Sequence, residues 1–270
     1  MDQITPKDSS EMPKRVFMFQ HEFNKLLVTD VIDDPYFHRL KGRSQDLDCL
    51  LTDVFGMASA TEPEGMSEVF PDNYPYHLVQ ALVGTALKSW VFQSDFRTHH
   101  FAQTEVRMRS HVILGLIWDP DKLYDFDRAC HESIIRDPLF SKEGVKGTVE
   151  QLENRFATTF QSVFKSKTGR EKLDSSLRSV IHAAVMLRAE MLVDEKSYKL
   201  LWPQAGSQFS RDEMETSRDI CSTTPGIVTM PLCPGFKAIP KKEATIDYAG
   251  LTMAATSNPE ATCVARALVC

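Results

Sequence analysis

Residues 76–96 constrain the fold of this chain more than any other segment. Apolar residues recur there at three- and four-residue steps, and further valines and leucines widen this face until the segment is apolar on most sides. A helix with such a pattern is usually buried at the centre of a bundle. Ala81, Gly84 and Ala86 are small, so a neighbouring helix can approach closely. We therefore predict that residues 76–96 form the most buried helix.

Helical periodicity covers most of the remaining chain up to Trp202. Asp-Pro pairs separate several segments, because the residue before a proline resists the helical conformation. Thr168-Gly169 is expected to end another helix, and the turn dipeptides Asn-Gly and Asp-Gly do not occur. The predicted fold class is all-α, an irregular multi-helix bundle with a Pro-rich extended C-terminal arm. The predicted helices cover residues 14–32, 44–57, 101–118, 121–136, 142–164 and 170–193, with a last helical turn over 198–202.

The chain ends differ in character from this helical part. We divide the sequence into a flexible arm over residues 1–13, a single helical domain over 14–221 and a Pro-rich C-terminal arm over 222–270. The C-terminal arm has no sustained helical period, yet it keeps more apolar residues than a solvated linker usually carries. We therefore expect residues 227–236 to wrap the bundle or to dock on a partner, and the last ten residues to stay mobile.

Composition sets limits on the compartment and the partners. The net charge is −6 over 270 residues, so the chain has no overall basic field for nucleic acid or anionic lipid. We do not expect nucleic-acid binding by direct sequence readout, and no apolar run is long enough for a membrane span. The N-terminal residues lack the apolar stretch of a secretory signal, and the six cysteines form no CxxC pair. We expect reduced thiols in an intracellular protein of the cytoplasm or nucleus.

Candidate metal ligands occur, but none has workable spacing. His99 and His100 are adjacent and point apart on a helix, and His131-Glu132 lacks the second histidine of a zinc motif. An EF-hand loop starting at Asp119 would need Gly and Glu where Tyr124 and Cys130 stand. Capping of the next helix by its acidic residues is the better interpretation. We predict no metal and no cofactor; a metal found nonetheless would direct attention to Asp119, Asp121, Asp125 and Asp127.

Catalytic motifs are equally absent. Asp30, Asp33 and Asp34 suggest the magnesium cluster of terpene cyclases, but the third carboxylate is missing and Asn154 lacks its usual companions. The chain has no GxSxG elbow, GxGxxG or phosphate-binding loop. The catalytic residues, if the chain has any, are unknown.

Two basic clusters break the acidic background. The structural interpretation is a solvated helix-end surface, and the alternative for the second cluster is a nuclear-import or anion-binding patch. The clusters are Arg97, His99, His100, Arg107, Arg109 and His111, and then Lys165, Lys167, Arg170 and Lys172.

Two motifs carry a family resemblance. Residues 77–92, HLVQALVGTALKSWVF, and residues 198–214, YKLLWPQAGSQFSRDEM, resemble segments of an uncharacterised family of filamentous-fungal helical proteins. The chain departs from that pattern at Ser210, where Asp is usual, and by an insertion between Pro203 and Gly206. The resemblance extends over roughly residues 14–236 and implies a helical, intracellular domain of regulatory role without an assigned reaction. It transfers no catalytic residue, and Trp90, Phe92, Trp202 and Phe209 are interpreted as packing residues.

Two functions follow as expectations. The first is a non-catalytic intracellular regulatory or interaction module of a filamentous fungus, binding a protein or a small apolar ligand. The second is an enzyme or accessory protein of fungal specialised metabolism that uses a pocket in the bundle. A fully packed bundle favours the first, whereas an internal cavity of several hundred Å3 lined by convergent His, Asp or Arg favours the second.

Overall fold

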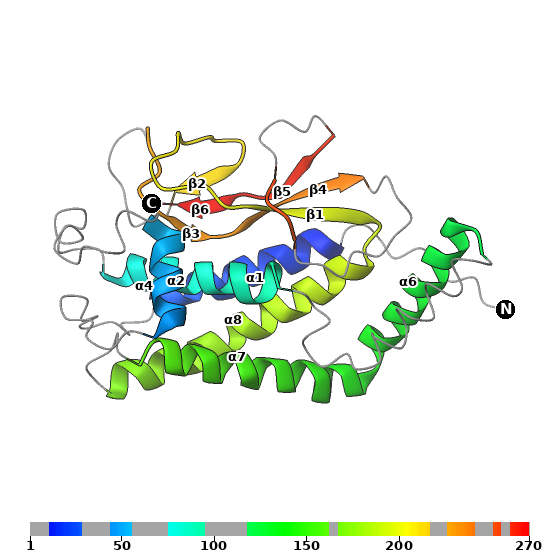
Figure 1. Ribbon diagram of the computed structural model, residues 1–270, viewed down its shortest axis with the longest axis horizontal. Coiled ribbons are helices and arrows are strands. Elements are labelled where there is room, and N and C mark those ends of the chain that lie inside the picture. Colours follow the sequence, from blue (N-terminus) through cyan, green and yellow to red (C-terminus); the bar gives the residue numbers. More distant parts are fainter. Residues whose placement is uncertain are drawn as a thin grey trace.

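Helices and strands form separate layers in the computed structural model of the protein (Figure 1). The structure describes residues 11–28, 44–55, 75–94, 118–161, 167–216, 226–240, 251–254 and 260–269. The helices are α1 (Glu11–Val28), α2 (Gln45–Phe55), α4 (Pro75–Leu87), α6 (Pro120–Arg136), α7 (Lys146–Thr159) and α8 (Lys167–Val193), with π-helical segments η2 (Lys88–Phe92) and η4 (Phe140–Val145). The strands are β1 (Lys196–Leu201), β2 (Met214–Thr216), β3 (Pro231–Cys233), β4 (Gly235–Pro240), β5 (Thr262–Ala265) and β6 (Ala267–Val269).

The six strands build two three-stranded sheets, so the expected all-α fold is wrong. The first sheet has the order β1-β4-β5 and is antiparallel, with Leu201 opposite Gly235. In the second, of order β2-β6-β3, β6 runs parallel to β2 and antiparallel to β3. The protein is therefore a mixed fold of helices and small sheets.

The described stretches of the chain after residue 222 supply strands to these sheets, so the expected Pro-rich extended arm is wrong. Strands β3 to β6 all come from it, and they pair with β1 and β2 from the chain before residue 221. Backbone pairing satisfies the hydrogen-bonding groups that a proline-interrupted sequence cannot satisfy within a helix. The last ten residues include β5 and β6 instead of a mobile end. The segment 198–202, expected as a helical turn, lies largely in β1, where buried Tyr198 and Leu200 alternate with half-buried Ser197 and Lys199.

The described helices agree broadly with the predicted ranges. Every described side chain from His77 to Lys88 is buried, as predicted for the central helix, which then passes into η2. α1 begins at Glu11, so the expected N-terminal arm overlaps its first turn. α8 begins at Lys167, so Thr168-Gly169 lies in its first turn and does not end the preceding helix. The helix expected over 101–118 lies, apart from its last residue, outside the described residues.

One large hydrophobic core joins the helices to the sheets. Met230, Leu232 and Phe236 belong to it, so most of the segment 227–236 packs on the helices, while Ile227 is exposed. The Phe236 ring lies edge-on to Phe19 of α1 and Phe92 of η2, with ring centroids 6.2 and 5.1 Å apart. No described helix is long and apolar enough to cross a membrane.

Candidate functional site: a basic groove between three helices

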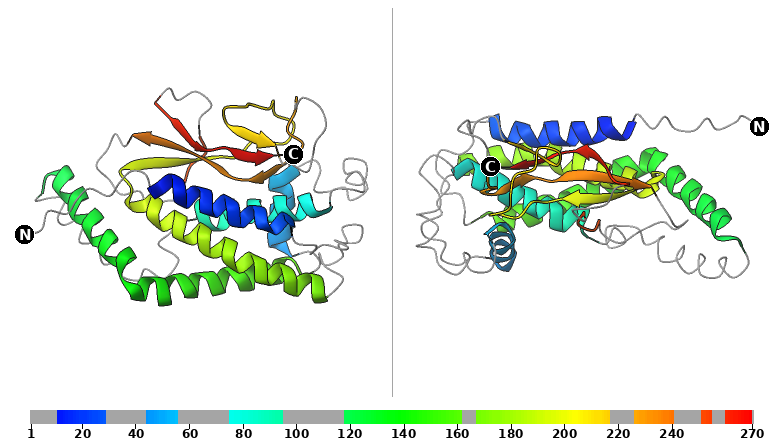
Figure 2. Two further views of the ribbon diagram at one scale, coloured as in Figure 1. Left: turned by 180° about the vertical axis from the view of Figure 1, so that it is seen from behind. Right: turned by 90° about the horizontal axis from the view of Figure 1, so that it is seen from above.

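A surface cavity of about 730 Å3 lies where α1, α7 and α8 meet. The left view of Figure 2 shows α1 and α8 side by side with α7 along the next edge. Apolar side chains form the floor and charged or polar side chains form the rim. We call this cavity the basic groove; its floor is Met18, Val149, Ala183, Met186 and Leu187, and its rim is Arg15, Glu22, Lys146, Arg178, Ser179 and His182.

Helical periodicity places these side chains together. α1 uses Val16, Phe19 and Phe23 to reach the core, which turns Arg15, Met18 and Glu22 toward the groove at steps of three and four residues. α8 presents the stretch from Arg178 to Leu187 in the same way, and α7 adds Lys146 and Val149. The groove therefore uses helix faces adjacent to those that build the core.

Among the side chains that line the groove, three cations outnumber one carboxylate, in a chain that is negative overall. The lysine and arginine side chains of the rim are Arg15, Lys146 and Arg178. The one carboxylate of the rim, Glu22, already forms an ion pair with Lys25. Each cation also contacts a carboxylate beside the groove, and such exposed pairs are worth about 0–1 kcal/mol, so an incoming anion can replace them at small cost. The pairs are Arg15–Glu190 at 3.8 Å, Lys146–Glu150 at 3.8 Å and Arg178–Glu153 at 3.5 Å.

The other end of the α1–α8 contact is predominantly acidic. A small cavity of about 70 Å3 shares Arg15 with the basic groove and reaches α6 and the start of β1. Its lining includes the five carboxylates Glu11, Glu132, Glu190, Asp194 and Glu195 against Arg15, Arg128 and Lys196.

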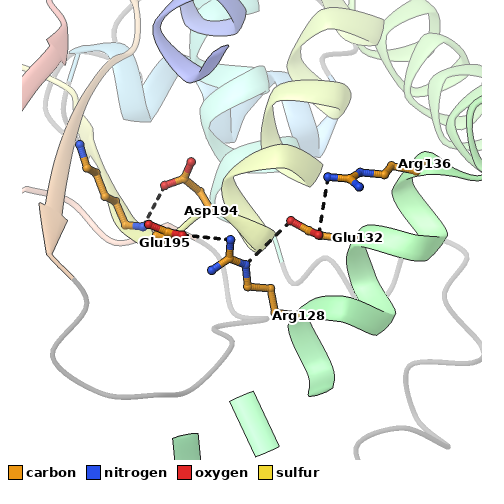
Figure 3. A network of polar contacts seen from close by, with 6 residues as sticks. Arg128, Glu132, Arg136, Asp194 and Glu195 are labelled. Atoms are coloured by element: carbon orange, nitrogen blue, oxygen red, sulfur yellow. Dashed lines mark hydrogen bonds and ion pairs between the residues drawn. The ribbon is translucent and has the colours of Figure 1, made fainter. Parts of the chain in front are cut away.

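At this acidic end, one ion pair links α6 to the residues that follow α8, and two further pairs lie within α6 (Figure 3). Arg128 lies 3.9 Å from Glu132 and 3.2 Å from Glu195, and Arg136 lies 3.6 Å from Glu132. Beside them, Asp194 accepts the backbone N–H of Lys196. The arginines and glutamates of this network pair with one another, and the Arg128–Glu195 pair helps to hold α6 in place.

Tyr198 lies beside this network. Burial raises the pKa of its phenol, and the charge of Asp194, to which the phenol donates a hydrogen bond, raises it further. The side chain therefore stays protonated and structural.

The acidic residues considered as metal ligands have structural positions. Asp119 accepts the backbone N–H of Asp121 at 2.9 Å, which confirms the predicted cap of α6. Asp121 and Asp125 are exposed, and the side chains of Asp127 and His131 lie outside the described residues. Within the described ranges, no group of three or more His, Cys, Asp or Glu could hold a metal ion.

Several other candidates fall where the structure gives no description. Asp30, Asp33, Asp34, Lys165 and the whole cluster from Arg97 to His111 lie outside the described residues. The side chains of Lys167, Arg170 and Lys172 at the start of α8 also lie outside them. Asn154 is exposed on α7, where its carbonyl accepts the Thr158 hydroxyl.

The aromatic residues of the two resemblance motifs are packing residues. Trp90, Phe92 and Trp202 are buried, and Phe209 packs against the small cluster of Met214, Val228 and Val269. Two cations accompany the tryptophans. Arg155 lies 4.1 Å from the Trp90 ring centroid, and Lys88 lies 5.5 Å from that of Trp202.

The described cysteines do not form disulfide bonds. Cys49, Cys233 and Cys263 are free, and their surroundings differ. Burial raises the pKa of the Cys233 thiol, and partial burial raises that of Cys263. Neither thiol therefore has the lowered pKa of a catalytic nucleophile.

Comparison with known proteins adds no relative. No family model, curated protein or solved structure matches the chain. The resemblance to filamentous-fungal helical proteins stays a prediction, and function is inferred from the geometry.

Sequence reasoning missed the basic groove because its cations are far apart along the chain. One signal was present. Residues 16–19 of α1 read Val-Phe-Met-Phe, which is more apolar surface than one buried face needs. Val16 and Phe19 fill the core, whereas Phe17 is 68% and Met18 55% exposed. Surplus apolar residues on a helix that already has a buried face point to a second contact surface.

Proposed function

We propose that the protein is a non-catalytic interaction module that holds an acidic amphipathic segment of a protein partner in the basic groove. The observation that carries the proposal is the pairing of an apolar floor with a basic rim on an acidic chain. An amphipathic helix with acidic flanks offers the complementary arrangement, and helix-in-groove docking is a common mode of recognition. The rim cations would steer the partner and fix its register.

The dimensions of the groove suit a short helix. The lining runs over eight residues of α1 and ten of α8, and the end residues are about 10 to 14 Å apart at a rise of 1.5 Å per residue. This length accommodates about two helical turns of a partner. Met18 and Met186 supply a floor that adapts to different apolar side chains.

A protein partner fits the groove better than a small apolar ligand does. A small-molecule site buries most of its ligand, about 70–90% of the ligand surface. Here the side chains of Lys146 and Arg178 are more than half exposed, and Met18 is also exposed, so the groove is broad and open. The alternative function, an enzyme or accessory protein of fungal specialised metabolism, needs an internal pocket, whereas this cavity opens at the surface.

We place this module inside a fungal cell, in the cytoplasm or nucleus, in a regulatory role. The fungal origin rests on the motif resemblance. The three free thiols among the described cysteines suit a reducing compartment.

A designed peptide tests the proposal. The probe is a fluorescent 18-residue helix with a leucine stripe and glutamates on its other faces, and fluorescence anisotropy reports its binding. We expect micromolar affinity that falls with salt, and at least a tenfold loss in the double variant Lys146→Glu, Arg178→Glu, as expected for losing rim cations. The matched control is Lys14→Glu, Lys142→Glu, which makes the same charge change at exposed positions outside the groove lining. Equal affinity for both variants would refute the proposal.

A further inference from the structure

We propose that the occupant of the basic groove is the N-terminal part of α6 from a second copy of this chain. This inference rests on the proposed function, because it names the partner of the same groove. α6 projects away from the rest of the molecule in two directions of view (Figures 1 and 2). We call residues 118–126, which comprise the N-terminal end of α6 and the two residues before it, the α6 tip.

The α6 tip carries an exposed aromatic pair. Trp118 is 39% and Phe126 44% exposed, and their rings meet edge to face with centroids 5.5 Å apart. Large aromatic side chains held in one arrangement lose little conformational entropy on binding, and they are frequent anchors of protein interfaces. Leu123, three residues before Phe126 on α6, is buried within its own chain, whereas more than a third of each aromatic side chain stays exposed. This exposed aromatic surface is available for contact with another molecule.

Charge on the α6 tip complements charge on the groove. Asp119, Asp121 and Asp125 are exposed, and Lys122 is the one cation of the tip. The groove offers Arg15, Lys146 and Arg178, with His182 beside them. An acidic aromatic helix end and a basic apolar groove of the same chain thus match in both polarity and charge.

The α6 tip does not occupy the basic groove of its own chain. The Arg128–Glu195 ion pair links α6 to the residues that follow α8, and Ile135 packs against the core. None of the described side chains of residues 118–126 lines the groove of its own chain. If two copies exchange their tips, each groove is filled by the other chain, and the assembly closes as a two-fold dimer.

Sedimentation velocity between about 1 and 200 μM protein, a range that covers weak interfaces, tests the dimer. We expect a concentration-dependent monomer–dimer equilibrium that weakens with salt. The groove variant Lys146→Glu, Arg178→Glu and the tip variant Asp121→Lys, Asp125→Lys should each raise the dissociation constant at least tenfold. Combining all four substitutions in one chain should restore dimerisation, because the charges of tip and groove are exchanged. Asp212→Lys, Glu215→Lys is the matched control at exposed acids outside the tip.

The outcomes separate this inference from the proposed function. Circular dichroism first establishes that each variant is folded. A monomer throughout, with a groove that still binds the acidic peptide, overturns the second copy as partner and leaves the proposed function standing. A dimer that ignores both charge reversals, or one that the combined variant does not restore, also overturns the inference. A monomer whose groove binds no acidic peptide refutes both.

Discussion

The contact between α4 and β3 and the basic groove are opposite kinds of surface. At the first, the backbone of the sheet layer lies directly on a helix, and a Cβ atom built on Gly84 would stand 1.9 Å from the Leu232 carbonyl oxygen. At the second, exposed side chains on three helices surround a cavity of about 730 Å3. The first has no spare volume and the second is open. The difference teaches that this chain fixes its fold at the sheet layer and leaves the α1–α7–α8 face open, which is where we propose that a partner binds.

The largest predicted effect adds one methyl group to the tight contact. Alanine favours a helix by up to about 1 kcal/mol over glycine, but at Gly84 the added carbon would meet the Leu232 carbonyl. We expect Gly84→Ala to lower the free energy of unfolding by about 3 kcal/mol, the upper range for overpacking. Urea denaturation measures this value.

Gly144→Ala is the control, because the nearest atom there belongs to the Phe140 ring at 3.5 Å, an ordinary contact. The control should be neutral or stabilised. Equal stability of the two variants would show that α4 and β3 are not in close contact.

Gly84 also marks how far the sequence predicts the fold. The small residues of 76–96 predict a close approach to the central helix, and the approach occurs. The expected neighbour was a helix, whereas the structure places strand β3 there. A helix can be predicted from sequence because the residues of its buried face recur every three or four positions. The buried residues Val149, Leu152, Phe156 and Phe160 are an example.

The sheets could not be predicted in the same way. Each strand has three to six residues, and the pairing of Leu201 with Gly235 joins distant parts of the chain. Prolines at 231, 234 and 240 suggest an irregular segment, but they lie at the ends of β3 and β4 or between them. The absence of a side chain at Gly235 lets β4 approach the backbone of Ala267, because a Cβ there would lie 2.4 Å from the Ala267 nitrogen. Such constraints exist only between segments, so local patterns do not reveal them.

The candidate site was equally hidden. Arg15, Lys146 and Arg178 are spread over three helices, whereas the clusters that sequence reasoning selected are contiguous. Contiguous charge is visible in a sequence, and charge assembled by packing is not. On the described part of α1, the exposed Met18 was the local sign of the groove.

A smaller effect on the free energy of unfolding is expected at Arg155, which connects the buried Trp90 to Asp46 on α2. Arg155 covers the buried Trp90 ring and donates hydrogen bonds of 2.7 and 2.9 Å to Asp46 of α2. These hydrogen bonds lower the pKa of the Asp46 carboxyl, so their stabilisation is fully present above its unfolded value of about 3.9. It is lost as pH falls through the lowered, folded-state pKa.

We therefore expect Asp46→Asn to cost less than about 1 kcal/mol near pH 6, because the pair is partly exposed. The difference from the wild-type chain should shrink toward about pH 3 and below, as linkage requires. Urea denaturation across this range measures it, and Asp212→Asn serves as the exposed control. A gap that is constant with pH would show that Asp46 acts through packing and not through its charge.

The smallest effect on stability is expected in the groove itself. Met18→Ser removes an apolar side chain that is 55% exposed, whereas Val16→Ala, two residues earlier on α1, removes methyl groups that are fully buried. The first should change the free energy of unfolding by less than about 0.5 kcal/mol, the usual range for surface positions. The second should cost on the order of 1 to 2 kcal/mol, as for other buried methyl deletions. Binding of the acidic peptide should reverse this order, because Met18 forms the floor and Val16 does not. If Met18→Ser unfolds the protein and leaves peptide binding intact, the α1–α7–α8 face is structural, and the contrast between a fixed layer and a free one fails.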